Sequence, residues 1–282
     1  MQVPLISNNE IKELFDLSAQ AVDSLGCDEL PIVLSRICEY ISAYDTMMVY
    51  AFVKDEVPQP LFNNFKIKEI NNCWVPYFEG AYLLDPFYEL SKQKVDDGFY
   101  HLRDIAPDDF FESEYFNSFF RPTRLRDETT LIVNLNENVQ VHLSLGLRDN
   151  QASLTTNDLH RLDLIAGLLI ALTRSHWPDI KPDQPQGIGR VGAHLENAFS
   201  LFGSSCLSER ECEIVRYILR GHSSKSIARL LDISPETVKV YRKRVHQKLD
   251  ITSHGELFSI FLKCLKTTPV GSTADPLTFI KV

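Results

Sequence analysis

The chain has 282 residues, of which 44% are hydrophobic, and a formal net charge of -9. This length favours two domains, each with enough apolar residues to bury a core. The six cysteines form no CxxC pair, and the first residues contain neither a basic region nor an apolar run, so we expect a cytoplasmic protein with reduced thiols, no secretion signal and no membrane span.

The patterns of residues 1–177 predict one domain of the α+β class. Apolar residues recur at helical or strand spacing, and turn residues separate the runs. In chain order they predict helices over 8–25 and 28–43, strands over 46–53 and 60–66, helical segments over 72–93 and 108–120, strands over 129–135 and 139–147, and a helix over 155–175. This order favours a mainly antiparallel sheet between helices, an α/β/α sandwich.

A cluster of aromatic residues lies in the first helical segment, where the sandwich would have space between the sheet and its cover. Aromatic rings with polar tips beside one carboxylate suit a pocket for a small organic ligand. Each residue taken singly fits an ordinary core or surface position better, whereas the cluster as a whole favours a pocket. The candidate ligand-binding residues are Trp74, Tyr77, Tyr82, Asp85 and Tyr88.

The helix predicted over 155–175 is apolar on more than one face. One stripe includes Leu162, Ile165 and Leu169, and a second consists of Leu164, Leu168 and Leu172. Packing on one core needs a single apolar stripe. The wider apolar surface of this helix therefore predicts that a second copy of the chain packs here, giving a homodimer.

The remaining residues divide into three parts. Residues 178–203 combine a semi-flexible linker, which has three prolines and two glycines over 178–190, with a connecting helix over 191–202. Residues 204–266 form an all-α domain of four helices. The tail over 267–282 has no periodic pattern, although Leu277, Phe279 and Ile280 could dock on the domain.

The all-α domain has the order of a helix-turn-helix. Ser208 and Glu211 fit a capping box, and Gly221 suits the end of the first helix. A short second helix and a tight turn follow, after which Ser234 caps the third helix with Pro235 at its first position. These signals place the second and third helices as the two helices of the motif.

The third helix carries a basic stripe. Residues 206–268 hold 12 Lys and Arg against 7 Asp and Glu, whereas residues 1–205 hold 16 against 30. Cations and an apolar group on this helix suit base edges in the major groove, and flanking cations and hydroxyls suit phosphates. The candidate DNA-binding residues are Ser223, Ser224, Lys225, Thr237, Lys239, Val240, Arg242, Lys243, Arg244 and Lys248.

This stretch resembles the LuxR-type DNA-binding domain. The resemblance rests on Leu207 to Glu211, Gly221 with Ser223 and Lys225, Ile227-Ala228, Ile233 to Lys239, and Lys248-Leu249. It implies that Lys239, Val240 and Lys243 face the bases of double-stranded DNA. The chain departs from the family pattern at Ser224, at Tyr241 and at Ser253-His254.

Residues 74–86 resemble, more weakly, the signal-binding domain of LuxR-type quorum-sensing receptors. Trp74, Tyr77 and Asp85-Pro86 occur in the family order, with both gaps one residue shorter. The resemblance implies that these three side chains bond the polar head of a ligand. The architecture is also similar to that of GAF and PAS domains.

Together these features predict a DNA-binding transcriptional regulator controlled by an unidentified small molecule. Contact with RNA polymerase is left open. The chain has no nucleophile–base pair and no metal-ligand spacing, so no catalytic residue, metal or cofactor is expected. The alternative is a PAS-like domain that senses through a bound cofactor or a protein partner. A response regulator is disfavoured, because the chain opens on an amphipathic helix.

Overall fold

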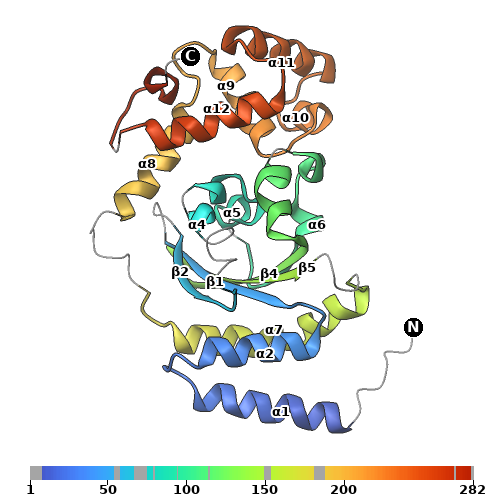
Figure 1. Cartoon of the computed structure of the whole chain (residues 1–282). Helices are drawn as coiled ribbons and strands as arrows, with labels where there is room; N and C mark the ends of the chain where they lie inside the picture. The colour runs from blue at the N-terminus through green and yellow to red at the C-terminus, as the bar shows by residue number, and fades with distance from the viewer. Residues whose placement is uncertain are drawn as a thin grey trace.

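The computed structural model describes residues 8–53, 58–66, 75–78, 80–93, 95–113, 115–148, 154–180, 188–269 and 271–280. Within them the chain forms a five-stranded antiparallel sheet with helices on both faces, followed by a group of helices towards the C-terminus (Figure 1). The predicted α+β class is confirmed. Among the residues described, no helix has the length and apolar character needed to cross a membrane.

The sheet has the strand order β2-β1-β5-β4-β3. Its strands are β1 (Thr46–Val53), β2 (Gln59–Asn63), β3 (Gly98–His101), β4 (Leu125–Asn136) and β5 (Val139–Arg148). Both predicted hairpins are present, as β1–β2 and β4–β5. The edge strand β3 was not predicted, because four residues that pair along one side leave little periodic signal. The structure also starts β4 earlier than residue 129, the predicted start.

One face of the sheet packs on helices. Alternate strand residues point to opposite faces, so Met47, Val49 and Ala51 of β1 share a core with side chains of β4, β5 and the covering helices. These helices are α1 (Asn8–Asp23), α2 (Leu30–Ile41) and α7 (Thr156–His176). Figure 1 shows α2 and α7 against the sheet and α1 beyond them as an outer layer.

The other face packs on short helical turns. They are α4 (Val75–Phe78), η2 (Ala81–Leu84), α5 (Pro86–Ser91), α6 (Leu102–Ile105), η3 (Phe110–Glu112), η4 (Phe116–Phe120) and η5 (Arg121–Thr123). The two longer helical segments predicted here are therefore wrong in length. Gly80 has a φ of 137°, and Asp85, which precedes a proline, is extended, so neither continues a helix.

The helical group contains the predicted order of elements. After α8 (Ile188–Leu201) come α9 (Glu209–Leu219), α10 (Ser224–Leu230), α11 (Pro235–Leu249), α12 (His254–Thr267) and the short turn η6 (Pro276–Phe279). Ser208 and Glu211 form the predicted capping box, and Ser223, Ser234 and Ser253 cap the next three helices. The capping serines and positive-φ turns fix where each helix starts and stops.

The tail docks on the end of α8 through a charged residue. Asp275 is buried and accepts hydrogen bonds from the backbone amides of Gly203 (3.0 Å) and Ser205 (2.8 Å) and from the Ser205 hydroxyl (2.6 Å). Of the apolar residues expected to dock, Ile280 is buried, Leu277 packs partly buried against the core, and Phe279 is 38% exposed.

We expect the helical layer under the sheet to contribute strongly to stability. Ile37 of α2 is fully buried, so Ile37→Ala should lower the free energy of unfolding by about 2–5 kcal/mol, because it leaves a cavity. Chemical denaturation of the full chain measures the change.

The matched control is Ile32→Ala on the same helix, since Ile32 is 50% exposed. This variant should stay within about 0.5 kcal/mol of the wild type. Equal losses for the two variants would contradict the assignment of the buried face.

Candidate ligand cavity and DNA-binding surface

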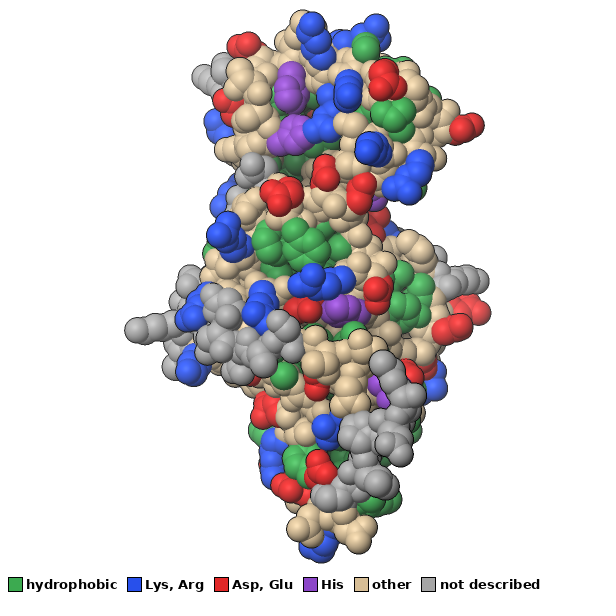
Figure 2. Space-filling view, turned by 90° about the vertical axis from the view of Figure 1, so that its right-hand side faces the viewer, with side chains coloured by type: hydrophobic (Ala, Val, Ile, Leu, Met, Phe, Trp, Pro, Cys, Tyr) green, Lys and Arg blue, Asp and Glu red, His purple; other side chains and the backbone are tan. Residues whose placement is uncertain are grey.

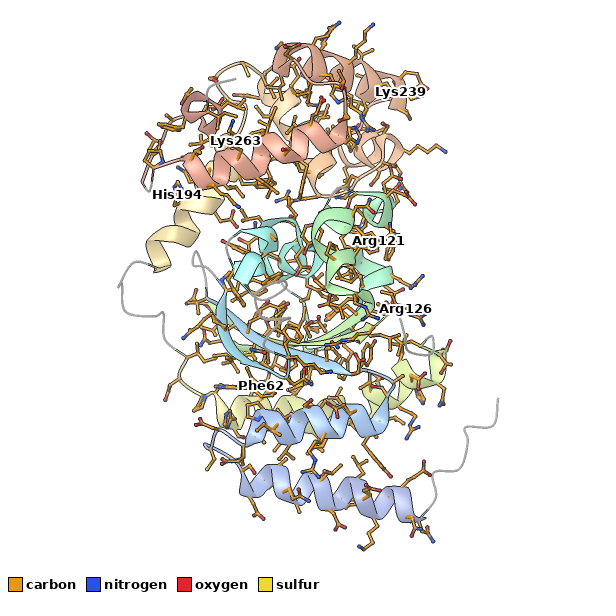
Figure 3. The ribbon with its side chains drawn as sticks, viewed as in Figure 1. Phe62, Arg121, Arg126, His194, Lys239 and Lys263 are labelled. Carbon is orange, nitrogen blue, oxygen red and sulfur yellow. The ribbon has the colours of Figure 1, made fainter. Side chains whose placement is uncertain are left out.

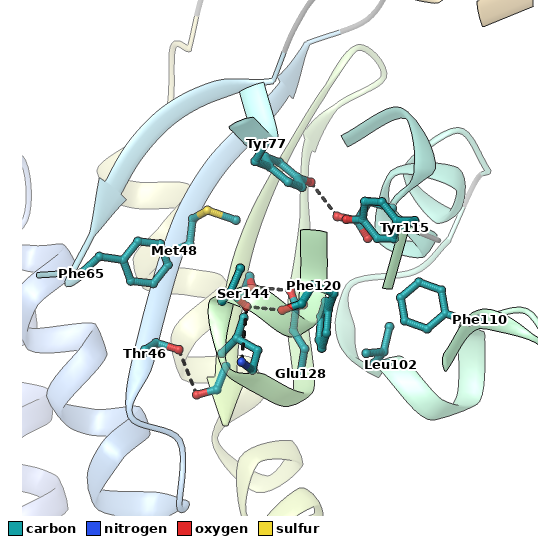
Figure 4. A pocket seen from close by; sticks show the side chains of 14 residues that line it. Thr46, Met48, Phe65, Tyr77, Leu102, Phe110, Tyr115, Phe120, Glu128 and Ser144 are labelled. Atoms are coloured by element: carbon teal, nitrogen blue, oxygen red, sulfur yellow. Dashed lines mark hydrogen bonds between the residues drawn. The ribbon is translucent and has the colours of Figure 1, made fainter. Parts of the chain in front are cut away.

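A small cavity lies between the second face of the sheet and the short helical turns (Figure 4). It encloses about 50 Å³ and is lined by Thr46, Met48, Phe65, Tyr77, Asp85, Leu102, Phe110, Tyr115, Phe120, Thr123, Leu125, Glu128, Ser144 and Gly146. This volume holds a few water molecules. An organic ligand of ordinary size therefore requires some of these side chains to move.

The predicted pair Tyr77 and Asp85 meets at one side of the cavity. The Tyr77 hydroxyl donates to Asp85 Oδ2 at 2.6 Å (Figure 4). The Phe87 amide donates to Asp85 Oδ1 at 2.9 Å. Asp85 is thus also the N-cap of α5. Burial raises the pKa of Asp85 to about 6, although these two hydrogen bonds act in the opposite direction.

A second carboxyl group, Glu128 on β4, lines the same cavity. The Ser144 hydroxyl of the adjacent strand donates to Glu128 Oε1 at 2.5 Å. Burial and, to a smaller extent, the charge of Asp85 together raise the pKa of Glu128 to about 8. Glu128 is therefore mostly protonated at neutral pH and can donate a hydrogen bond as well as accept one.

The other predicted ligand residues lie elsewhere. The Tyr82 and Tyr88 rings pack edge to face with centroids 4.9 Å apart, in the core beside the cavity and not among the residues that line it. Trp74 falls outside the described residues. Sequence reasoning missed Glu128, which stands in a polar run before the predicted strand, and Ser144, whose only signal was a polar residue between two leucines of a strand.

The candidate DNA-binding surface is built on α11. Its inner side chains Val238, Val245 and Leu249 are buried against the neighbouring helices. The turn between α10 and α11 directs the outer side outwards, where Lys239, Lys243 and Arg244 are exposed. Val240, on the same side, is 50% exposed. Figure 3 shows Lys239 at the end of the molecule opposite α1.

Four other candidate DNA-binding side chains are bonded to residues of the protein itself. Lys248 Nζ bonds Glu211 Oε2 at 2.7 Å, and Arg242 Nη1 donates to the Ser224 hydroxyl at 2.5 Å. Arg242 also contacts His254. Ser223 is bonded to Asp108.

Two further candidates differ in exposure. The Lys225 side chain is exposed at the start of α10. Thr237 is half-buried, and its hydroxyl bonds the hydroxyl of Ser234, the N-cap of α11.

Several known proteins are similar to this chain. Residues 205–261 match the family described as bacterial regulatory proteins, luxR family. An HTH-type transcriptional regulator in the exeN 3′ region of Aeromonas salmonicida is 30% identical over 198 residues, which cover 68% of this chain and 100% of that protein. The response regulator GacA of Pseudomonas aeruginosa is 49% identical over 51 residues, covering 18% of this chain and 24% of GacA.

A solved structure is similar to part of the chain as well. The crystal structure of the VqsR LBD domain from Pseudomonas aeruginosa has a TM-score of 0.52 and 24% sequence identity, and the match covers 57% of this chain and 94% of that domain. At this level of identity the likeness is one of fold.

The buried Glu128 generates a prediction about pH and stability. Its pKa is about 8 in the folded protein and near 4.5 in an unfolded chain, so between these values only the folded state keeps the proton. Stability therefore falls as the pH rises through this window. Glu128→Gln keeps the shape without the titration, so the variant should gain stability relative to the wild type from pH 4.5 to pH 8 in urea unfolding.

Glu137→Gln in the exposed turn between β4 and β5 is the control. It should follow the wild-type pH dependence. A Glu128→Gln difference that is constant across the window would contradict a buried, protonated Glu128.

Proposed function

The chain belongs to the LuxR family of bacterial regulatory proteins and is a transcriptional regulator, and on this premise we propose that a small organic ligand controls its binding to DNA. In this proposal α11 reads double-stranded DNA, the cavity over the sheet takes the ligand, and the chain acts as a homodimer.

The observation that carries the DNA part is the division of α11 into two sides. Three apolar side chains anchor it in the helical group, and exposed Lys239, Val240 and Lys243 occupy the other side. Lys side chains bond the acceptor atoms of guanine, and a valine contacts the methyl group of thymine. We assign base contacts to these three residues, and phosphate contacts to Lys225 and Arg244.

The observation that supports the ligand part is a cavity with polar groups at two sides. Asp85 with Tyr77 and Glu128 with Ser144 are buried in an otherwise apolar wall. A ligand with an apolar body and donor and acceptor groups fits this lining. Asp85 and Tyr77 are the residues proposed to bond it.

The homodimer is supported by one uncovered residue of α7. Leu164 is 61% exposed, whereas Leu168 and Leu172, the other two residues of the predicted second stripe, pack into the chain's own core below the sheet. Two copies joined along α7 would present two reading helices to DNA, and two half-sites give the affinity that one helix lacks.

We expect the basic side of α11 to contribute directly to DNA affinity. Lys243→Ala should weaken binding of the operator by about 1–3 kcal/mol, because it removes a contact to the DNA. Lys263→Ala is the matched control, as Lys263 is an exposed lysine of α12 in the same helical group. Fluorescence anisotropy with labelled operator DNA measures both, and equal losses would contradict the reading side.

We expect ligand binding to depend on the charge of Asp85. Asp85→Asn keeps an oxygen for the Phe87 amide and so retains the cap of α5, whereas an alanine would remove both functions. The wild type, purified from cells grown in rich medium, should carry an added small mass in native mass spectrometry, and the variant should carry less of it.

The same spectra report whether two copies associate. A wild type that carries no small mass, and that gains no thermal stability from a low-molecular-mass extract of the same cells, would contradict ligand sensing. If the wild type and Asp85→Asn carried the same amount of the small mass, ligand sensing would stand and only the role of Asp85 would be contradicted.

A further inference from the structure

The segment of residues 107–113, between α6 and η4, holds the helical group against the sheet domain. The Asp109 amide donates to the carbonyl of Gly221 at 3.1 Å. The carboxylate of Asp108 accepts hydrogen bonds from the Ser223 amide at 3.1 Å and from the Ser223 hydroxyl at 2.5 Å. Both partners lie in the turn between α9 and α10, immediately before the second helix of the helix-turn-helix.

The backbones approach closely at this point. Gly221 has a φ of 86°, and a Cβ added to it would lie 3.0 Å from the Cα of Phe110 and 3.1 Å from the Cβ of Ser113. Any other residue would therefore push the segment away. A second contact supports the same arrangement, since Arg220, the residue before Gly221, bonds Glu89 of α5 at 2.7 Å.

This contact brings negative charge to the candidate DNA-binding surface. The Ser223 hydroxyl, proposed from the sequence to hold a phosphate, is already bonded to Asp108. Asp109 and Glu112 line a hollow shared with Arg242 of α11. Figure 2 shows acidic side chains at the narrow waist below the Lys, Arg and His side chains of the helical group. DNA approaching α11 would meet these carboxylates with its own phosphates, which is unfavourable.

The same segment reaches into the ligand cavity. The ring of Phe110 is fully buried and lines the cavity, where it contacts the rings of Tyr115 and Phe120. Phe110 directly follows Asp108 and Asp109 in the chain. Because the cavity encloses only about 50 Å³, a ligand that enters must displace such rings, and moving Phe110 moves the residues bonded to Ser223 and Gly221.

We propose that residues 107–113 form an acidic clasp that holds the helical group in an arrangement inhibited for DNA binding, and that a ligand opens the clasp by displacing Phe110. The proposal rests on the proposed function and adds the segment that links the cavity to the turn between α9 and α10. The ligand shifts the equilibrium only as far as it prefers the open form over the closed one.

The first test measures DNA affinity of the full chain without ligand. The probe is a random-sequence duplex of about 30 base pairs, which spans two half-sites. Asp108→Ala should bind it about fivefold or more tightly than the wild type. Asp104→Ala removes the same charge from a side chain that is 80% exposed outside the clasp, and should change affinity much less. Equal effects of the two variants would overturn the inhibitory role.

The second test reads the clasp itself by hydrogen exchange of backbone amides. The Ser223 amide, which donates to Asp108, should exchange faster in Asp108→Ala. The Ser226 amide, which donates to the Ser223 hydroxyl oxygen, should stay protected and serves as the internal control. An unprotected Ser223 amide in the wild type overturns the clasp. A protected Ser223 amide in the wild type, together with an Asp108→Ala variant that exchanges faster there but still binds no DNA, contradicts the proposed function instead.

The link to the cavity is tested by overfilling it. Phe110→Trp enlarges a ring that lines the cavity and should open the clasp, raising both Ser223 exchange and DNA affinity. Phe111→Trp makes the same change at a neighbouring ring outside the cavity lining and should leave both near wild type. Circular dichroism checks that both variants fold. An unchanged Ser223 amide in folded Phe110→Trp overturns the link.

Discussion

The sheet is buried on both faces, and the rest of the structure depends on this constraint. One face is covered by α2 and α7, and a core of apolar side chains lies between them and the sheet. The other face carries Glu128 and Ser144, so these polar groups must find partners inside the protein. Glu128 and Ser144 bond each other, Asp85 is bonded from the covering side, and the space between the two groups is the cavity.

The covering side is made of short turns, and this connects the cavity to the helical group. A long helix over the sheet would be rigid and self-contained. Turns such as η3 are held by few hydrogen bonds of their own and by contacts at both ends. Phe110 contacts the cavity from inside while its neighbours bond the α9–α10 turn, so one segment joins the two parts.

How far the sequence predicts the structure depends on whether each feature is local. The caps of Ser208 and Ser234 and the stripe on α11 depend on residues within a few positions, and the helix-turn-helix could be predicted from them. The two hairpins could also be predicted, and so could Tyr77 and Asp85 as candidate ligand residues, although not their bond to each other.

Features set by distant residues could not be predicted. The pairing of β3 with β4, the partner of Glu128 across two strands and the bond from Asp108 to Ser223 join residues far apart in the chain. Aromatic spacing over 72–93 resembled a long helix, although Gly80 and the Asp85-Pro86 pair interrupt it. The sequence predicts that Ser223 holds a DNA phosphate, whereas in the structure its hydroxyl donates to the carboxylate of Asp108.

The central claim is that α11 binds DNA only when the clasp releases the helical group. Hydrogen exchange on the full chain with and without saturating duplex DNA tests this most directly. One experiment reports both on α11 and on the contact between the clasp and the α9–α10 turn. We predict slower exchange at the start of α11 and faster exchange at the Asp109 amide, which bonds Gly221 in the closed form. An Asp109 amide that stays protected while α11 is covered by DNA would contradict the account.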